Sequence, residues 1–565
     1  MSHIIELEID NYRGISSFSS RFDRGIICLV GRGDSGKTSV LDAIKAVLSP
    51  QWNLAFYDED FYALNTNSKI EIKISIADVP ESLISEKKYG LYVRAIDIDS
   101  RQIKDDIGDE DIPVLTIKLV VDQSLEPKWY VVNGRQQEDK PISAGDRAKL
   151  SCFMVSDYVD THFSWDKGNP LYTLLKSQSN KKDQEKLLLG VMREAKGKID
   201  DIDFSHLDGV TNTIKQKAAS LGLNLNEAQT TIDFREINVK EGKVSLHDGN
   251  IPFRLMGKGS KRLASIAIQT SVASQGGIAL IDEIEQGLEP DRVRQIARTL
   301  KSENHGQVII TTHSRDVITE FEADDLLVLH RNKLSGKVVS EFLSLDENKL
   351  QGVIRACPEA FFARKVIVCE GATEIGICRA LDSYRMSAGL DSLSFKGCAY
   401  VDGSGGSFPD RAINIADSGI AACVLCDSDV DGELSPSKDD LRGASIDIYD
   451  VDKGLSLEEQ LFKDLPWEAV KDILNYVMSV HGKTEDSLGE SISSRYENGK
   501  LPDDWINEDS ENMRKALGLT AKKKDWFKRV DHGEVIGSII FDCFDKLDGK
   551  RIKDILQGVI SWVDK

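Results

Sequence analysis

The chain of 565 residues is 41% hydrophobic and 29% charged, which excludes a disordered protein and allows about three or four globular domains. No apolar run reaches the roughly 18 residues of a membrane span, and the nine cysteines, an odd number, favour a reducing compartment, so we expect a cytoplasmic protein without membrane contacts. The net charge of −21 repels nucleic acid, so any nucleic-acid contact has to be local or bridged by cations.

The N-terminal segment predicts paired strands that lead into a phosphate-binding turn. The strand "GIICLV" is followed by "GRGDSGKT", which fits the pattern G-x-x-x-x-G-K-[ST], and by the helical stretch "SVLDAIKAVL". Glycines let this loop close around phosphate, Lys37 reaches the β- and γ-phosphates, and the Thr38 hydroxyl is a ligand for Mg²⁺. The residues expected to hold ATP and its Mg²⁺ here are Gly31, Gly33, Asp34, Ser35, Gly36, Lys37, Thr38 and Ser39.

Residues from about 70 to 160 continue strand-rich, and the stretch that follows changes character. Leu171, Leu174 and Leu175, then Leu187, Leu188 and Val191, recur at helical spacing among many Lys, Gln and Asp residues. We interpret this stretch as a helical insertion and a candidate dimerisation arm.

Two further buried strands end in polar residues. In "IALIDEIE", Asp282 is expected to hold Mg²⁺ and Glu283 to orient or deprotonate the attacking water. About thirty residues later, "VIITTHS" places His313 at another strand end. Three such motifs in this order favour a nucleotide-hydrolysing site.

The N-terminal "IDNYRG", the phosphate-binding loop (P-loop), the Asp–Glu strand and the His strand together resemble the ABC-type ATPase heads of the RecF/SMC class. The resemblance implies that "GKGSKRL", residues 257–263, is the signature motif that acts across a homodimer or higher homo-oligomer, through Gly257, Gly259 and Ser260. Met256 stands where the signature serine usually lies, and Ser260 is the candidate replacement. The resemblance also makes His313 a sensor of the γ-phosphate and Arg13 a nucleotide-facing residue.

Acidic residues also end two strands of a second α/β unit. Glu370 follows "KVIVC", and Asp427 and Asp429 follow "GIAACVLC". The segment "DSDVDG" fits half of an EF-hand loop, but loop position twelve is Lys438 and a strand precedes the loop instead of a helix. The carboxyl ends of neighbouring strands face one crevice, so Glu370 is expected to meet Asp427 and Asp429 there. Such a cluster needs cations, and hard oxygen ligands favour Mg²⁺ or Mn²⁺.

Three further acids lie near the predicted metal site in the sequence. Glu374 shares a helix face with Glu370 and is a candidate fourth ligand. Asp431 is expected to support the loop rather than to bind metal, and the role of Glu433 stays open.

The order "VCEG" and then "CDSDVDG" resembles the Toprim domain, in which a glutamate and a D-x-D pair bind one or two metals for phosphodiester chemistry. An ABC head followed by a Toprim domain resembles the OLD (overcoming lysogenization defect) family of nucleases, which includes the Gabija A subunit and retron-associated effectors. This resemblance implies a further ligand, Glu458 in "GLSLEEQL", and a lysine that stabilises the transition state, Lys524 in "AKKKDWFKRV", with Lys523 next in line. From the residues alone, the basic cluster in "AKKKDWFKRV" is equally a patch that tracks the phosphates of a nucleic acid or a solvated helix face.

The sequence therefore predicts an α/β protein with an ABC-type ATPase in two parts, 1–168 and 233–345, a helical insertion at 169–232, and a Toprim domain with a helical C-terminal region at 346–565. The expected function is an ATP-controlled, metal-dependent endonuclease of anti-phage defence that cuts DNA, with a helicase or a reverse transcriptase complex as a candidate partner. The alternatives are a non-nucleolytic ATP-dependent DNA clamp or repair protein, and a nuclease that cuts RNA such as tRNA.

Overall fold

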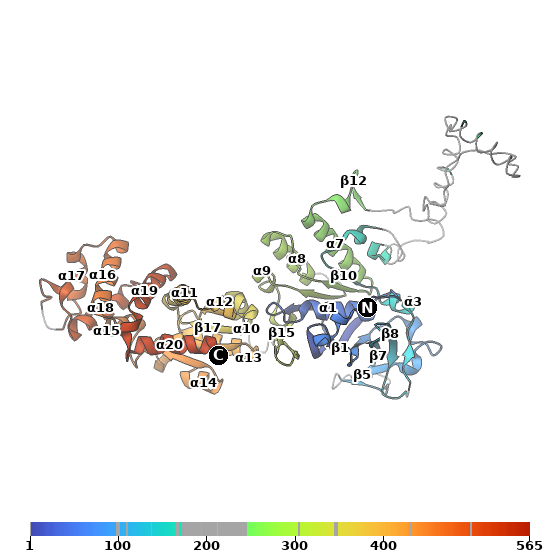
Figure 1. The fold of residues 1–565 in the computed structure, drawn as a ribbon, viewed down its shortest axis with the longest axis horizontal. Coiled ribbons are helices and arrows are strands. Elements are labelled where there is room, and N and C mark those ends of the chain that lie inside the picture. The colour runs from blue at the N-terminus through green and yellow to red at the C-terminus, as the bar shows by residue number, and fades with distance from the viewer. Residues whose placement is uncertain are drawn as a thin grey trace.

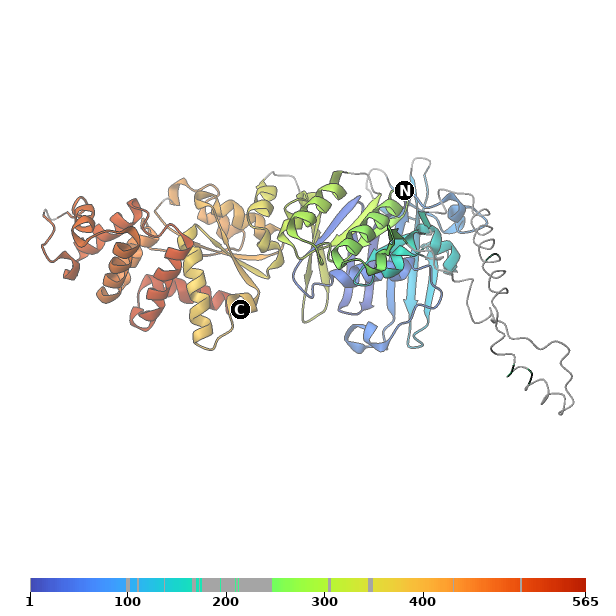
Figure 2. The same cartoon turned by 90° about the horizontal axis from the view of Figure 1, so that it is seen from above.

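The structure is a computed structural model. It describes residues 2–97, 102–108, 111–136, 138–164, 169–171, 173–174, 246–302, 306–343, 349–429, 431–497 and 500–565, and the single residues 194, 209 and 212. The expected insertion at 169–232 lies almost entirely outside the described residues. Two lobes follow one another along the long axis of the molecule, an N-terminal lobe of residues up to 343 and a C-terminal lobe from 349 onward (Figures 1 and 2). No helix in the described ranges is long and apolar enough to cross a bilayer.

An antiparallel sheet forms one layer of the N-terminal lobe. Its strand order is β2-β1-β4-β7-β5-β6, and β8 and β9 continue from β7. Residues alternate between the buried and open faces, as in β4, where Ile70, Ile72, Ile74 and Ile76 are fully buried. The strands are β1 (His3–Tyr12), β2 (Ile15–Arg21), β4 (Ile70–Ala77), β5 (Arg94–Ile96), β6 (Ile103–Lys104), β7 (Ile112–Val121), β8 (Pro127–Val132) and β9 (Lys140–Pro141).

A second sheet has the order β10-β13-β14-β3-β15-β16 and is parallel except for β16. Its strands are β3 (Ile26–Val30), β10 (Cys152–Val155), β13 (Ile278–Ile281), β14 (Gln307–Thr311), β15 (Leu326–Arg331) and β16 (Val338–Phe342). Strands such as "IALI" are apolar throughout because both faces of this sheet are covered. Helix α1 (Lys37–Leu48) packs into one core with strands of both sheets. The opposite face carries α7 (Lys258–Ala273), α8 (Pro290–Ser302) and α9 (Arg315–Ile318).

The C-terminal lobe is built on four parallel strands in the order β18-β17-β19-β20. Alternate residues of β17 enter different cores: Val366 and Val368 pack with α13 on one face, whereas Ile367 and Cys369 pack with α11 on the other. The strands are β17 (Lys365–Cys369), β18 (Cys398–Asp402), β19 (Ala421–Cys426) and β20 (Asp447–Asp450). The helices around the sheet are α10 (Lys349–Ala356), α11 (Ala372–Ser387), α12 (Leu393–Lys396), α13 (Phe408–Asp417) and α14 (Lys438–Gly443).

The C-terminal helices α15 to α19 lie toward the outer end of this lobe, farthest from the N-terminal lobe, whereas α20 runs back beside β20 and α12 (Figure 1). They share one core with α11, and α11 packs closely against α19. Their bounds are α15 (Leu457–Asp464), α16 (Trp467–His481), α17 (Glu485–Ser493), α18 (Glu511–Lys523), α19 (Val530–Asp542) and α20 (Arg551–Asp564).

The lobes meet through opposite edges of their parallel sheets. His330, near the carboxyl end of β15, donates from Nε2 to the carbonyl of Ser418, which lies just before the amino end of β19, at 3.3 Å. One hydrophobic core continues from the N-terminal lobe through α10 and α13 to the sheet of the C-terminal lobe. The carboxyl edge of the C-terminal sheet therefore faces away from the N-terminal lobe.

Candidate nucleotide site and carboxylate cluster

The P-loop connects β3 to α1 and is folded around the ammonium of Lys37. Lys37 Nζ donates to the carbonyls of Gly31 at 2.7 Å and Arg32 at 3.0 Å, and lies 3.4 Å from Ser35 Oγ. Burial lowers the pKa of Lys37 to about 8. Gly36 has a φ of 97°, and a Cβ on Gly31 would lie 2.6 Å from the Leu329 carbonyl, so both positions require glycine.

Asp282 follows β13 and closes onto the P-loop. Its Oδ1 accepts hydrogen bonds from Thr38 at 3.2 Å and from Thr311 at 2.6 Å. Thr311 Oγ1 also accepts from the backbone N–H of Glu283 at 2.7 Å, which fixes Glu283 in a left-handed conformation with a φ of 46°. Burial, followed by the neighbouring Asp282, raises the pKa of Glu283. The structure thus brings the predicted Thr38, Asp282 and Glu283 together. Thr311, which was not predicted, links Asp282 to Glu283.

His313 lies beyond β14, and its backbone is held by a third acid of the "DEIE" segment. Glu285 accepts from the His313 N–H at 2.6 Å and from the Thr312 hydroxyl at 2.8 Å. Burial lowers the pKa of the His313 ring. Glu285 was not predicted as a site residue; the signal for it in the sequence is that it is the third acid after the strand β13, two residues beyond Glu283.

The predicted signature motif begins α7, with Gly257 as its N-cap and Gly259 and Ser260 in the first turn. Arg262, which was not predicted, is only 4% exposed and links this helix to the Asp–Glu segment. Its guanidinium donates to the carbonyls of Asp282 and Glu283, the latter at 2.8 Å, and to that of Ser156 at 3.1 Å. Arg262 therefore ties α7 directly to the backbone that carries Glu283.

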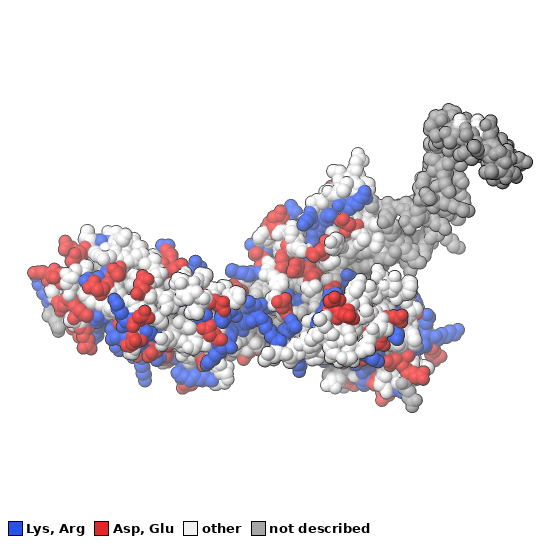
Figure 3. Space-filling view, viewed as in Figure 1, with Lys and Arg blue, Asp and Glu red and all other residues white. Residues whose placement is uncertain are grey.

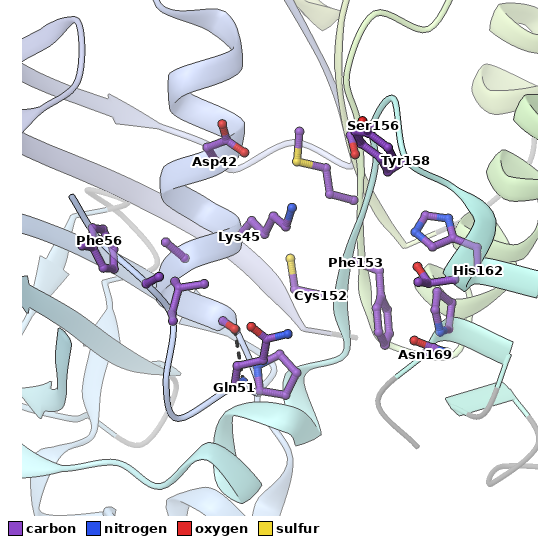
Figure 4. A pocket seen from close by; sticks show the side chains of 18 of the residues that line it. Asp42, Lys45, Gln51, Phe56, Cys152, Phe153, Ser156, Tyr158, His162 and Asn169 are labelled. Atoms are coloured by element: carbon purple, nitrogen blue, oxygen red, sulfur yellow. Dashed lines mark hydrogen bonds between the residues drawn. The ribbon is translucent and has the colours of Figure 1, made fainter. Parts of the chain in front are cut away.

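Arg13 lies in the β1–β2 turn and is already paired. It forms ion pairs with Asp42 of α1 and with Asp60, the latter at 2.9 Å. Arg13 and Asp42 line a cavity of about 350 Å³ between α1 and the segment after β10, in which Asp42 and Lys45 face Ser156 and Tyr158 (Figure 4). No P-loop residue lines this cavity, so the nucleotide contact of Arg13 stays a prediction.

The predicted carboxylates of the C-terminal lobe converge at the carboxyl edge of its sheet. Glu370 directly follows β17, and its Oε2 accepts from the backbone N–H of Asp427, directly after β19, at 2.8 Å. Asp427 Oδ1 in turn accepts from the N–H of Leu457 at the start of α15, at 2.7 Å. Glu374, in the first turn of α11, and Glu458, in the first turn of α15, are 6% and 4% exposed. Two strand ends and two helix starts therefore supply one acidic cluster.

Four of the five carboxylates in this cluster have no ion-pair partner in the part of the chain that the structure describes. Burial raises the pKa of Glu370, Glu374 and Asp427. Repulsion adds to this effect, from Asp429 on Glu370, from Glu370 on Glu374 and from Glu374 on Asp427. Over the ranges that the structure describes, neither these three nor Glu458 forms an ion pair. No three side chains there are already arranged around a common ion. The donor set, buried carboxylates with uncompensated charge, nevertheless fits Mg²⁺ or Mn²⁺.

A lysine at the end of α18 reaches the cluster, but it is not the predicted one. Lys522 Nζ lies 2.5 Å from Asp429 Oδ2 and 3.8 Å from Glu459 Oε2. Lys523 and Lys524 are exposed. Trp526 is 1% exposed and belongs to the core, so it is not an aromatic platform between the lysines.

Lys438, the residue at position twelve of the calcium-loop pattern, explains how the D-x-D loop is held. Its Nζ donates to the Asp427 carbonyl at 2.8 Å, to Ser428 Oγ at 2.9 Å and to Asp450 Oδ2 at 2.9 Å, and lies 2.7 Å from Asp431 Oδ1. A buried ammonium thus ties the loop together, and it pairs with Asp431, whereas Glu433 is exposed.

Comparisons with known proteins assign both lobes. Residues 3–318, more than half of the 565, match the family model of the AAA ATPase domain, and residues 361–429 match that of the overcoming lysogenization defect protein-like Toprim domain. The chain belongs to the AAA ATPase-domain family. Together with the Toprim domain, it has the ATPase–Toprim architecture of the OLD family.

Individual relatives are distant. The energy-coupling factor transporter ATP-binding protein EcfA2 of Staphylococcus aureus is 27% identical over 111 residues, which cover 19% of this chain and 37% of that protein. An Smc head domain from Pyrococcus furiosus (17% identity, TM-score 0.36) aligns with 61% of this chain and 97% of its own. An SMC head from Thermotoga maritima (12%, 0.29) and the recombination mediator RecF (16%, 0.31) each align with 60% of this chain and with 99% and 98% of their own. At these scores the structural likeness carries no functional argument.

Proposed function

We propose that this protein is an ATP-binding, divalent-metal-dependent endonuclease that cuts DNA at the Toprim carboxylate cluster and serves in prokaryotic defence against phage. The observation that carries the proposal is the set of buried, uncompensated carboxylates at the carboxyl edge of the Toprim sheet. A protein of net charge −21 cannot approach a phosphodiester with these groups unless cations reverse the local potential. The defence role rests on the OLD-type architecture.

The residues that would hold one or two Mg²⁺ or Mn²⁺ ions are Glu370, Glu374, Asp427, Asp429 and Glu458. Bound there, such ions supply an activated water and stabilise the leaving oxygen. The chain itself orients these carboxylates: the Asp427 N–H holds Glu370, the Leu457 N–H holds Asp427, and the Lys522 ammonium holds Asp429. In this arrangement Lys522 takes the place foreseen for Lys524.

In the ATPase domain, Lys37 and the P-loop amides would bind the phosphates of ATP, and Thr38 and Asp282 would hold its Mg²⁺. Glu283 would orient the attacking water. The signature segment Gly257, Gly259 and Ser260 and the sensor His313 would act across a pair of ATPase domains, so we propose a homodimer or a higher homo-oligomer. The Arg262 contacts support coupling between that interface and Glu283.

The proposal is tested by incubating supercoiled plasmid with the protein and Mg²⁺ or Mn²⁺. Wild type is expected to nick or linearise the plasmid, whereas Glu370→Ala and Asp427→Ala are expected to leave it intact. Glu433→Ala is the matched control, because Glu433 is an exposed acid of the same loop. Equal cleavage by wild type and both cluster variants would refute the assignment, and cleavage of RNA but not DNA would correct the substrate.

A further inference from the structure

A basic cavity lies where the ATPase and Toprim domains meet. Its volume is about 530 Å³, within the range of small-molecule sites. The P-loop, residues 31–35, forms one wall, the β15–β16 hairpin with Arg331 and Lys333 forms the second, and Arg364 of the Toprim domain forms the third. Lys and Arg side chains gather at this junction on the surface of the molecule (Figure 3).

The cations of this cavity lack partners. In the portion of the chain that the structure describes, the side chains of Arg32, Arg331, Lys333 and Arg364 form no ion pair, and Arg331 Nε is buried without a hydrogen-bond acceptor. Asp34 is the one acid among the lining residues. Four cations and one carboxylate around this open cavity favour an anionic occupant.

Two of the arginines, one from each domain, lie against the same turn. The Arg364 N–H donates to the Gly397 carbonyl at 2.8 Å. Gly397 has a φ of 77°, and a Cβ there would lie 1.3 Å from Arg32 Nη1, so the P-loop guanidinium covers this glycine. Burial and then the charge of Arg364 lower the pKa of Arg32. Like charges are therefore held close together across the domain boundary, and an anion between them would remove the repulsion.

We propose that Arg364 of the Toprim domain, together with Arg32, contacts the phosphates of the nucleotide bound at the P-loop, so that one nucleotide touches both domains. This inference rests on the proposed ATP binding and adds a contact from outside the ATPase domain. The cavity lies at the carboxyl edge of the ATPase sheet, where ligands of parallel α/β sheets bind.

The position of the cavity favours a nucleotide over a nucleic-acid strand. The cavity touches the Toprim domain just before the amino end of β17, whereas Glu370 follows the carboxyl end of the same strand. Five residues of strand separate the two edges by roughly 16 Å. Arg364 therefore lies away from the proposed cleavage site, whereas residues of the P-loop line the same cavity as Arg364.

A nucleotide that contacts both domains is linked to their relative arrangement. It binds more tightly when Arg364 is in place, and by reciprocity it stabilises the docking of the Toprim domain onto the P-loop. The docking of the Toprim domain would thereby depend on whether the P-loop of the same chain holds a nucleotide.

The test is equilibrium titration of the full-length protein with a fluorescent ATP analogue and Mg²⁺, without DNA. Arg364→Ala is expected to raise the Kd about tenfold, as for the loss of one charge-assisted contact, and Arg364→Lys to keep most of the affinity. Arg292→Ala is the matched control, because Arg292 is an exposed arginine of α8 that pairs with Glu289 and does not line the cavity. Since Arg364 is exposed, thermal unfolding without nucleotide should not change, whereas the ATP-induced shift should shrink.

An unchanged Kd for Arg364→Ala, with binding lost in Lys37→Ala, would overturn this inference and leave the P-loop assignment intact. Weaker binding of a labelled DNA duplex by Arg364→Ala, at unchanged nucleotide affinity, would show that the cavity serves nucleic acid instead. Absence of nucleotide binding by wild type would overturn the proposed function and this inference together.

Discussion

The two parallel sheets both carry acidic residues where their strands end, but the surroundings of these acids differ. In the ATPase domain, Asp282 accepts two threonine hydroxyls, and Glu285 accepts a hydroxyl and a backbone N–H. At the Toprim edge, Glu370, Glu374, Asp427 and Glu458 have no ion-pair partner among the described residues. Within the described ranges Asp282 and Glu285 form no ion pair either, and Glu370 and Asp427 also accept backbone N–H groups. The two sites differ in burial: Glu374 and Glu458 are 6% and 4% exposed, whereas Asp282 and Glu285 are half-buried, so charge on the Toprim acids depends more on a bound cation.

The largest expected effect is the loss of DNA cleavage when the Toprim carboxylate cluster is altered. Asp427→Asn keeps the acceptor for the Leu457 N–H but removes one negative charge from the cluster. Plasmid cleavage should fall by at least about a hundredfold, because loss of even an indirect metal contact costs roughly tenfold to a hundredfold. Initial rates of nicking with saturating Mn²⁺ measure this. Cleavage within a few-fold of wild type would show that the charge of Asp427 is not needed.

The next largest effect is expected on ATP binding by the ATPase domain. Lys37→Ala removes the ammonium that fills the P-loop and should weaken ATP binding about tenfold to a hundredfold, as for the loss of a strong charged hydrogen bond. Glu283→Gln should instead retain bound ATP, since it leaves the P-loop intact. Filter binding of labelled ATP compares them, and normal binding by Lys37→Ala would refute the P-loop assignment.

A smaller effect separates the lysine named from the sequence from the one that the structure places at the cluster. Lys522→Ala should slow cleavage about tenfold, because Asp429 loses the cation that orients it. Lys524→Ala should cleave like wild type, since Lys524 forms no ion pair with a carboxylate of the cluster in the described part of the chain. The same nicking assay at one metal concentration ranks the two. Slower cleavage by Lys524→Ala than by Lys522→Ala would support Lys524 as the lysine that stabilises the transition state.

The smallest expected effect is on the free energy of unfolding, which is compared between a variant of the ATPase site and a variant of the Toprim cluster. In EDTA, Asp282→Ala leaves the buried Thr311 hydroxyl without its acceptor and should cost about 1–3 kcal/mol. Burial raises the pKa of Asp427 to about 9, so its carboxyl is largely protonated at neutral pH without metal; Asp427→Asn replaces it with a neutral amide of similar shape and should leave the midpoint of thermal unfolding unchanged or higher. Thermal melts of the two variants beside wild type test this contrast. A lower midpoint for Asp427→Asn than for Asp282→Ala would show that the Toprim cluster is the self-sufficient one.

Much of the fold followed from local patterns. Apolar strands ending in Gly31, Asp282 and Glu370 are short, contiguous signals, and the rule that carboxyl ends of neighbouring parallel strands share a crevice was enough to bring Glu370 and Asp427 together. The ATPase and Toprim assignments made from these motifs are confirmed by the family comparisons.

Other features depend on contacts between segments far apart in the chain. Lys522 rather than Lys524 reaches Asp429 because of where α18 ends against α15, which no motif spacing encodes. Arg262 and Lys438 act through backbone carbonyls that belong to other elements. Arg32 and Arg364 reach the same turn at Gly397 only because the two domains dock edge to edge.

The central claim is that the Toprim carboxylates bind the divalent ion needed for cleavage, and calorimetric titration with Mn²⁺ tests it most directly. Performed in a Lys37→Ala background without nucleotide, it isolates this cluster from the ATP site. We predict saturable Mn²⁺ binding that Glu370→Gln and Asp427→Asn each abolish and that Glu433→Gln preserves. Identical binding curves for all four proteins would contradict the account.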